Sequence, residues 1–222
     1  MSIKLVIFDM DGLMFDTERV IYEVWADIIT NMGQEPSISL FSKSMGGHEP
    51  GVVEHYEKAF GRKVSMEEIL DIFHLTDTTF PEVIRQNGVG IKKGLPELLA
   101  WLEEENINKV IASSSSQETI RRYLDVTGID PNRFIHLVSG DMVTNLKPDP
   151  EIFLLACEKA GVAPNEAVVL EDSRNGLRAA VAAGIPCMLV PDLLTPDKDI
   201  FEKAYKVPKD LLEVIDIIKD MR

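Results

Sequence analysis

Near its N-terminus the sequence reads LVIFDMDG at residues 5–12, four apolar residues followed by two aspartates on either side of Met10 and by a glycine. A short, continuous apolar run is typical of a strand that is buried on both faces. Gly12 lets the chain turn sharply where this strand ends. Binding sites form at the carboxyl ends of the strands in a parallel sheet, so we expect both Asp9 and Asp11 to face such a site.

Apolar runs of the same kind recur along the chain, and helical patterns lie between them. We expect further strands at residues 109–112, 136–138, 167–170 and 187–190. We expect helices at residues 95–105, 117–127, 150–160, 173–183 and 209–221. This alternation predicts an α/β fold, a doubly wound and mostly parallel Rossmann-like sheet with helices on both faces.

The segment between the first two strands is different, because it contains no strand pattern. Helical patterns cover residues 17–32, 51–60 and 66–85. We therefore predict an α-helical cap domain over residues 17–87, inserted into an α/β core domain made of residues 1–16 and 88–222. The connections between them are expected near residues 15–16 and 87–93.

The charge balance restricts the partners. The 222 residues include 23 Lys and Arg against 37 Asp and Glu, a formal net charge of −14. Such an acidic chain lacks the basic surface that nucleic acids and anionic membranes require. No stretch approaches the roughly 18 apolar residues of a membrane-spanning helix, and the N-terminus does not resemble a signal peptide. We expect a cytoplasmic monomer.

Only two cysteines occur in the sequence, Cys157 and Cys187. Both lie in apolar segments, and neither has a His or Cys partner at a spacing typical of a metal site. We expect buried free thiols in a reducing compartment.

Three further polar groups follow predicted strands. A serine run at residues 113–116 offers hydroxyl and backbone N–H groups that suit a phosphate oxygen, although such a run also caps helices. Lys147 precedes a proline-constrained turn and could neutralise a carboxylate and a phosphoryl group, although it could also be a solvated lysine. Glu171 and Asp172 suit a hard cation, although Asp172 could simply cap the next helix.

The order of these groups favours a common site. Each follows a predicted parallel strand, so all should lie at the same edge of the sheet. Together they supply a nucleophile, an acid/base, a phosphate-binding group and a metal site.

With Asp9, Asp11, Ser113, Lys147 and the Glu171-Asp172 pair in this order, the chain resembles the haloacid dehalogenase superfamily. The fuller string FDMDGLMFDTE at residues 8–18 resembles its β-phosphoglucomutase-like branch, which carries a helical cap after the first strand. The resemblance covers nearly the whole chain.

The resemblance implies a role for each matching residue. Asp9 would be the nucleophile that becomes an aspartyl phosphate, and Asp11 the general acid/base. Ser113 would bind the phosphoryl group with backbone N–H groups near Ser114, and Lys147 would stabilise charge. The implied cofactor is Mg²⁺, held by the carboxylate of Asp9, the backbone carbonyl of Asp11 and the carboxylate of Asp172, with Glu171 at or beside the metal shell.

The branch contains both phosphatases and sugar phosphomutases, and two departures favour hydrolysis. The mutase has a histidine in its cap where this chain has Ile21. The mutase also has an arginine after its cap glycine, whereas residues 45–50 here read MGGHEP. Gly46, Gly47 and His48 are expected to form a substrate-facing cap loop, and His48 could contact the leaving group.

Other chemistries fit less well. Dehalogenases of the superfamily lack the acid/base that Asp11 would provide. Phosphonate cleavage would require a Schiff-base lysine in the cap, where Lys43 and Lys58 are better explained as solvated surface charges. We therefore expect a Mg²⁺-dependent phosphatase for small phosphomonoesters, such as sugar phosphates. The alternatives are a β-phosphoglucomutase-type mutase and a non-catalytic phosphate- or partner-binding module.

Overall fold

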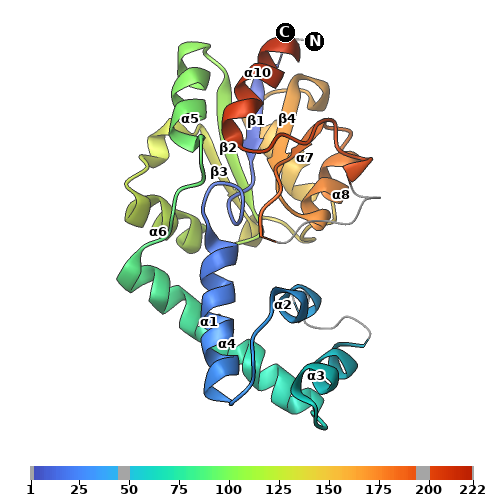
Figure 1. Ribbon diagram of the computed structural model, residues 1–222. Coiled ribbons are helices and arrows are strands. Elements are labelled where there is room, and N and C mark those ends of the chain that lie inside the picture. Colours follow the sequence, from blue (N-terminus) through green and yellow to red (C-terminus); the bar gives the residue numbers. More distant parts are fainter. Residues whose placement is uncertain (1–2, 45–50, 194–200, 222) are drawn as a thin grey trace. The chain divides into compact units, whose positions relative to one another are not determined.

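The computed structural model of the protein describes residues 3–44, 51–193 and 201–221 (Figure 1). The chain divides into two compact units. One unit, the α/β unit, comprises residues 1–16 and 89–222. The other, the helical unit, comprises residues 17–88.

The α/β unit is built on a parallel sheet of five strands in the order β3-β2-β1-β4-β5. The strands are β1 (Leu5–Phe8), β2 (Asn108–Ser113), β3 (His136–Ser139), β4 (Ala167–Glu171) and β5 (Cys187–Leu189). All five lie where the apolar runs predicted strands. The α/β fold and the parallel sheet are thus confirmed.

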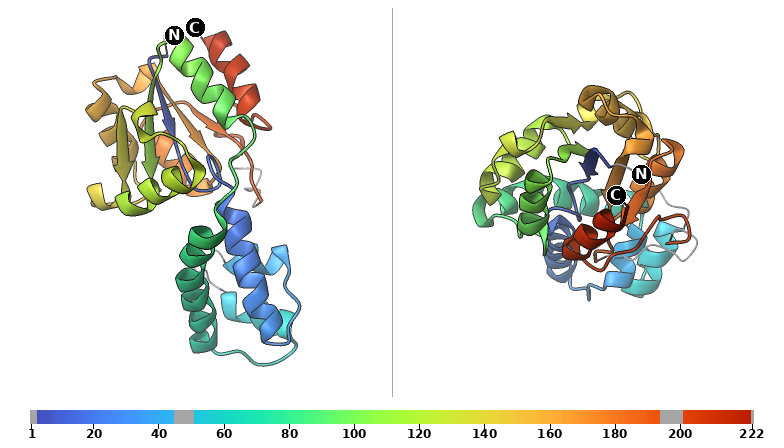
Figure 2. Two further views of the ribbon diagram at one scale, coloured as in Figure 1. Left: turned by 90° about the vertical axis from the view of Figure 1, so that its left-hand side faces the viewer. Right: turned by 90° about the horizontal axis from the view of Figure 1, so that it is seen from above.

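Helices cover both faces of the sheet (Figures 1 and 2). On one face α7 (Glu151–Ala160) and α8 (Arg174–Ala182) bury Phe153 and Leu177 against alternate strand residues. The other face carries α5 (Leu95–Glu104), α6 (Gln117–Thr127) and α10 (Leu211–Met221). Because both faces are covered, β1 is fully buried, which explains its uninterrupted apolar sequence.

The register of the sheet brings the strand ends together. Phe8 in β1 lies beside Ile111 in β2 and beside Leu170 in β4. The residues that follow these three strands therefore leave the sheet at the same edge.

The loop after β1 is folded tightly onto the core. Gly12 has a φ of 79°, a left-handed conformation that favours glycine. Its backbone N–H donates to the carbonyl of Phe15 at 3.0 Å, and the N–H of Met14 donates to the carbonyl of Met10 at 2.9 Å. Met10, Met14 and Phe15 are fully buried, so the loop that carries the two aspartates is fixed by apolar packing.

The two connecting segments pair with each other. Phe15 and Ile91 form an antiparallel bridge. The N–H of Asp16 donates to the carbonyl of Gly90 at 2.9 Å, and the N–H of Lys92 donates to the carbonyl of Met14 at 2.9 Å. These bonds tie the end of the first segment to the start of the second, both within the α/β unit.

The helical unit contains α1 (Thr17–Asn31), α2 (Ile38–Ser44), α3 (Val52–Phe60) and α4 (Met66–Asn87). Helices α1 and α4 pack side by side. Inside the unit the indole N–H of Trp25 and the hydroxyl of Ser44 both donate to the hydroxyl of Tyr56, each at 3.1 Å. Helix α2 was not predicted; it is short, and the hydroxyl of Ser37 caps it by accepting from the N–H of Leu40 at 3.2 Å.

Capping explains small differences between the predicted and observed helix ends. Ser173 is the N-cap of α8 and not its first residue, and its hydroxyl accepts from the N–H of Gly176 at 3.0 Å. Ser116 caps α6, which has the predicted bounds, and its hydroxyl accepts from the N–H of Thr119 at 3.2 Å. The last helix begins at Leu211, two residues later than predicted, because the carboxylate of Asp210 accepts from the N–H of Leu212 at 3.1 Å.

Two further expectations concern the chain as a whole. Cys157 and Cys187 are buried and free, as predicted. Within residues 3–44, 51–193 and 201–221, every helix is either too short or too polar to cross a membrane.

Candidate active site

The candidate site lies where the strand order reverses. From β1 the chain continues to β2 and β3 on one side, and later to β4 and β5 on the other. The neighbouring strands β1 and β4 therefore form a topological switch point, where α/β sheets bind ligands at the carboxyl ends of their strands. Asp9 directly follows β1, Glu171 ends β4 and Asp172 follows it.

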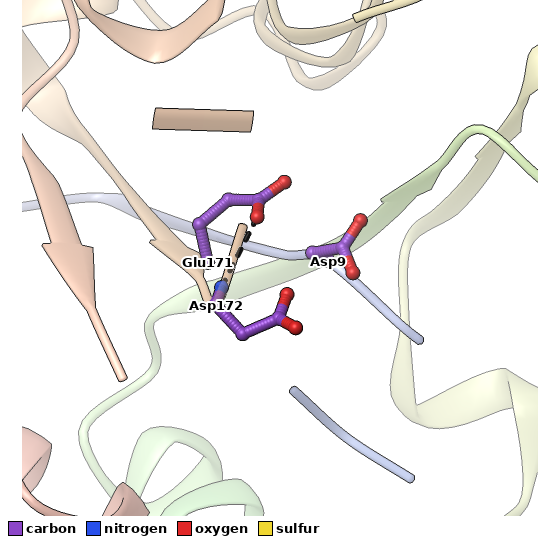
Figure 3. A group of neighbouring side chains, drawn as sticks. All are labelled: Asp9, Glu171 and Asp172. Carbon is purple, nitrogen blue, oxygen red and sulfur yellow. Dashed lines mark hydrogen bonds between the residues drawn. The ribbon is translucent and has the colours of Figure 1, made fainter. Parts of the chain in front are cut away.

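Three buried carboxylates gather at this point (Figure 3). Oxygens of Asp9, Glu171 and Asp172 all lie within 4.8 Å of one another. Asp9 retains strand-like pairing, because its N–H donates to the carbonyl of Leu170 at 3.0 Å. Such a group of like charges in the interior needs cations to balance it.

Lys147 is the cation that the structure places beside this group. Its ammonium contacts Oδ1 of Asp9 and donates to Oε1 of Glu171 at 2.7 Å and to the carbonyl of Ala112 at 3.0 Å. The ring of Phe153 lies 4.8 Å from the ammonium. All three N–H donors of this buried lysine are therefore directed at named acceptors.

Glu171 is held on both of its carboxylate oxygens. Oε1 accepts from Lys147, while Oε2 accepts from the N–H of Asp172 at 3.1 Å, the N–H of Ser173 at 3.0 Å and the hydroxyl of Ser173 at 2.9 Å. The residue is fully buried. This arrangement makes Glu171 a support for Lys147 and for the turn that carries Asp172.

Two glycines leave room for the carboxylates. A Cβ atom on Gly176, at the start of α8, would lie 1.7 Å from Oε1 of Glu171. A Cβ atom on Gly12 would lie 2.1 Å from Oδ2 of Asp172. Both positions require the absence of a side chain, because real Cβ contacts do not occur at such distances.

Asp11 faces two serines from the end of β2. Oδ2 of Asp11 accepts from the hydroxyl of Ser115 at 2.9 Å, and the hydroxyl of Ser113 lies 3.5 Å from the same oxygen. The hydroxyl of Ser113 in turn accepts from the N–H of Ser115 at 3.0 Å. Ser113 and Ser115 therefore face the site, whereas Ser114 is exposed. The fourth serine, Ser116, caps α6.

The local charges shift the acid–base properties of the site. Burial raises the pKa of Asp9 to about 8, against the lowering effect of Lys147, and the carboxylates of Glu171 and Asp11 add to the rise. Burial lowers the pKa of Lys147, but Asp9 and Glu171 outweigh it and hold the pKa above its usual range. Without a further cation, Asp9 therefore favours its protonated form at neutral pH.

The donor set fits a hard divalent cation. It consists of buried carboxylate oxygens, the ligands that Mg²⁺ and Ca²⁺ prefer, and it excludes the sulfur and imidazole groups that softer metals favour. The four carboxylates of Asp9, Asp11, Glu171 and Asp172 carry more charge than Lys147, which pairs with Asp9 and Glu171, can balance. A cation would reduce this excess and lower the pKa of Asp9.

The α/β unit brings together six of the residues proposed from the sequence, namely Asp9, Asp11, Ser113, Lys147, Glu171 and Asp172. Ser114 is exposed and its neighbour Ser115 makes the contact with Asp11. Gly46, Gly47 and His48 lie outside the described residues.

Three residues at the site were not predicted from the sequence. Ser115 belongs to the serine run, and its position two residues after Ser113 could have indicated that both serines reach the site. Gly176 follows the Glu171-Asp172 pair at the start of a helix, but only the structure reveals its contact. Asp192 lies beyond β5 in a segment without a recognisable motif.

Comparisons with known proteins agree with this architecture. A carbohydrate phosphatase of Thermotoga maritima, named phosphorylated carbohydrates phosphatase, is 33% identical over 96% of this chain and 98% of its own length. The crystal structure of a "putative beta-phosphoglucomutase" of the same organism superimposes with a TM-score of 0.75 at 29% identity, covering 99% of this chain and 100% of the other.

A third relative is CbbY of Rhodobacter sphaeroides, whose structure in complex with phosphate has a TM-score of 0.69 at 25% identity over 96% of each chain. The sequence pattern of the haloacid dehalogenase-like hydrolase family matches residues 6–190. This match covers most of the chain, and the strand-end carboxylates and Lys147 agree with it. The chain therefore belongs to the haloacid dehalogenase-like hydrolases.

Proposed function

We propose that the protein is a Mg²⁺-dependent phosphatase that hydrolyses small phosphomonoesters, in particular sugar phosphates, through an aspartyl phosphate on Asp9. The observation that carries the proposal is the pairing of the buried Asp9 carboxylate with Lys147 beside Glu171 and Asp172. The similarity to the phosphorylated carbohydrates phosphatase supports the substrate class.

Asp9 is the proposed nucleophile because it is a buried carboxylate held at the strand end by a backbone bond and by Lys147. One of its oxygens would attack phosphorus as the bond from phosphorus to the leaving oxygen breaks. Lys147, together with the bound Mg²⁺, would keep the carboxylate ionised, and Lys147 would then stabilise the charge on the transferring phosphoryl group.

Asp11 is the proposed general acid and base. It would first donate a proton to the leaving oxygen. It would then take a proton from the water that attacks the aspartyl phosphate, so that phosphate leaves and Asp9 is regenerated. The hydroxyl of Ser115, 2.9 Å from Oδ2 of Asp11, holds the carboxylate in place for both steps.

The phosphoryl group would bind between β1 and β2. The hydroxyl of Ser113 and the backbone N–H groups at the start of the serine run offer donors beside Asp11. Lys147, which contacts Asp9 and the carbonyl of Ala112 in β2, offers the cation. The carboxylates of Asp9 and Asp172 and the backbone carbonyl of Asp11 would hold Mg²⁺, which supplies positive charge for a dianionic ester.

Glu171 completes the acidic group, and its contacts suit an indirect role. Both of its oxygens accept hydrogen bonds from Lys147 or from the backbone and hydroxyl of the following residues. The helical unit is proposed to act as a cap that contributes to substrate selection and excludes water during transfer.

A phosphomutase is the second candidate, supported by the name of the Thermotoga maritima structure. Ile21, where the mutase has a histidine, favours hydrolysis instead. Incubation with β-glucose 1-phosphate and glucose 1,6-bisphosphate separates the two activities. Faster formation of glucose 6-phosphate than of inorganic phosphate would identify a mutase.

The proposal is tested by measuring phosphate release from a panel of phosphomonoesters, with Mg²⁺ and with EDTA. Wild-type protein should turn over sugar phosphates only with Mg²⁺, and Asp9→Asn should abolish turnover. The exposed Asp125 on α6 provides a matched control, because Asp125→Asn removes an equal charge away from the site. Binding of phosphate without hydrolysis of any ester would instead indicate a non-catalytic module.

A further inference from the structure

Asp192 lies next to the candidate metal group but was not among the predicted site residues. It follows β5, which lies beside β4 in the sheet. The pairing of the two strands continues just before Asp192, because the N–H of Val190 donates to the carbonyl of Glu171 at 2.7 Å. The side chain of Asp192 is only 7% exposed. A carboxylate that is this deeply buried needs partners for both of its oxygens.

One oxygen of Asp192 has such a partner. Oδ1 forms an ion pair with the ammonium of Lys92, which also lies 3.8 Å from Oδ1 of Asp16. The backbone of Lys92 is fixed by its bond to Met14, so the lysine approaches Asp192 from the connecting segment. The ion pair holds Asp192 in a defined orientation.

The other oxygen lies near Asp172, one member of the metal group. Oδ2 of Asp192 is buried and accepts no hydrogen bond from any residue in the described ranges. A Cβ atom on Gly12 would lie 3.4 Å from this oxygen and 2.1 Å from Oδ2 of Asp172, so both carboxylates lie over the same glycine. Oxygens of Asp172 and Asp192 lie within 4.8 Å of each other.

From this geometry we infer that Asp192 is an additional carboxylate of the metal site, whose Oδ2 accepts a hydrogen bond from a water molecule bound to Mg²⁺. This inference rests on the proposed function. Mg²⁺ keeps several of its waters in protein sites, and these waters are strong donors. Residues that orient the groups around a metal commonly contribute about 10–100-fold to its affinity.

In this arrangement Lys92 positions Asp192, and Asp192 positions metal-bound water beside Asp172. A metal-bound water would thus satisfy the buried Oδ2 of Asp192, which accepts no hydrogen bond from the described residues. This arrangement also explains why a second carboxylate is tolerated so close to Asp172, since a divalent cation balances both.

The test is the affinity for Mg²⁺ in the absence of substrate, measured by titration calorimetry on the full chain. Asp192→Asn keeps the shape of the side chain and should weaken Mg²⁺ binding about 10–100-fold. Asp16→Asn removes the other acidic neighbour of Lys92 and should change the affinity less than about threefold by comparison. An equal loss in Asp16→Asn would reveal a general charge effect and overturn the inference.

Lys92→Gln distinguishes a metal role from a purely structural ion pair. Glutamine keeps an N–H donor for Oδ1 of Asp192 and so can preserve its orientation. Removing only the positive charge should therefore leave Mg²⁺ affinity unchanged or raise it, because Asp192 keeps its charge. A loss equal to that of Asp192→Asn would mean that only the ion pair matters and would overturn the inference. If Asp192→Asn does not fold, Asp192→Ser, which also removes the carboxylate, takes its place, and wild-type affinity in that variant would overturn the inference as well.

Asp172→Asn separates this inference from the proposed function. If it binds Mg²⁺ as tightly as wild type, the metal site itself is wrongly assigned. If it loses Mg²⁺ while Asp192→Asn retains wild-type affinity, the metal site stands and the role of Asp192 alone is wrong.

Discussion

Glu171 accepts a hydrogen bond from the ammonium of Lys147 at 2.7 Å, with its carboxylate fully buried. Lys147 in turn contacts Asp9, so a glutamate at the end of β4 sets the position of the cation beside the nucleophile at the end of β1. The charge of Glu171 therefore matters for Lys147 even if Glu171 never touches the metal.

Glu171→Gln should lower kcat about 100-fold, because it removes the charge that holds Lys147 and thereby weakens stabilisation of the transferring group. It should also destabilise the fold by about 3 kcal/mol, because a buried ion pair loses one partner. Steady-state kinetics and denaturant unfolding measure both effects. The control is Glu166→Gln, since Glu166 pairs with exposed Lys4 at the other end of β4. Unchanged kcat in Glu171→Gln would contradict this role.

Gly176→Ala should displace the Glu171 carboxylate, because the new methyl group would lie 1.7 Å from Oε1. We expect a loss of about 1–3 kcal/mol in stability from overpacking, together with a fall in kcat like that of Glu171→Gln. Gly90→Ala is a suitable control, because its added Cβ would make only an ordinary contact at 3.5 Å. Wild-type activity in Gly176→Ala would show that the Glu171 carboxylate can move without consequence.

Ser115→Ala should lower kcat about tenfold, because Asp11 loses the hydroxyl that accompanies it at 2.9 Å. The pH dependence of kcat should change as well, because the proposed acid/base group loses a hydrogen-bond partner. Ser114→Ala changes an exposed hydroxyl in the same run and should leave both kcat and the pH profile unchanged. Equal effects in the two variants would refute the assignment of Ser115.

Binding of Mg²⁺ should release close to one proton at about pH 6.5, because burial raises the pKa of Asp9 to about 8 and the metal requires its ionised form. Metal affinity should consequently increase as the pH rises towards the Asp9 pKa of about 8, and it should level off above that pH. The number of protons released on binding should decline over the same range. Calorimetry in buffers of different ionisation enthalpy measures the released proton. Proton release that is absent at about pH 6.5 would contradict the protonated state of metal-free Asp9.

The sequence was sufficient for the parts of the fold and site that depend on short-range pattern. The apolar run before Asp9 predicted a buried strand. The later apolar runs predicted further strands, and from their ends Ser113, Lys147 and Asp172 were expected at the same edge of the sheet. The apolar runs locate where each buried parallel strand ends, so the polar residues that follow these runs can be assigned to the carboxyl edge of the sheet.

Other features depend on contacts between segments that are distant in the chain. Helix α2 is too short for its periodicity to stand out. The choice between Ser114 and Ser115 depends on the turn after β2, and the need for Gly176 depends on where the Glu171 side chain ends. Asp192 is brought to the site only by the pairing of β5 with β4.

The most direct test of the central claim is to trap the phosphorylated enzyme. Wild-type protein is mixed with a sugar phosphate that it hydrolyses and Mg²⁺, quenched in acid within one turnover and reduced with tritiated borohydride, which labels an acyl phosphate. Label is expected in the peptide that contains Asp9, and none in Asp9→Asn. Phosphate release by the wild type without label at Asp9, or with label at another carboxylate, would contradict the proposed aspartyl phosphate on Asp9.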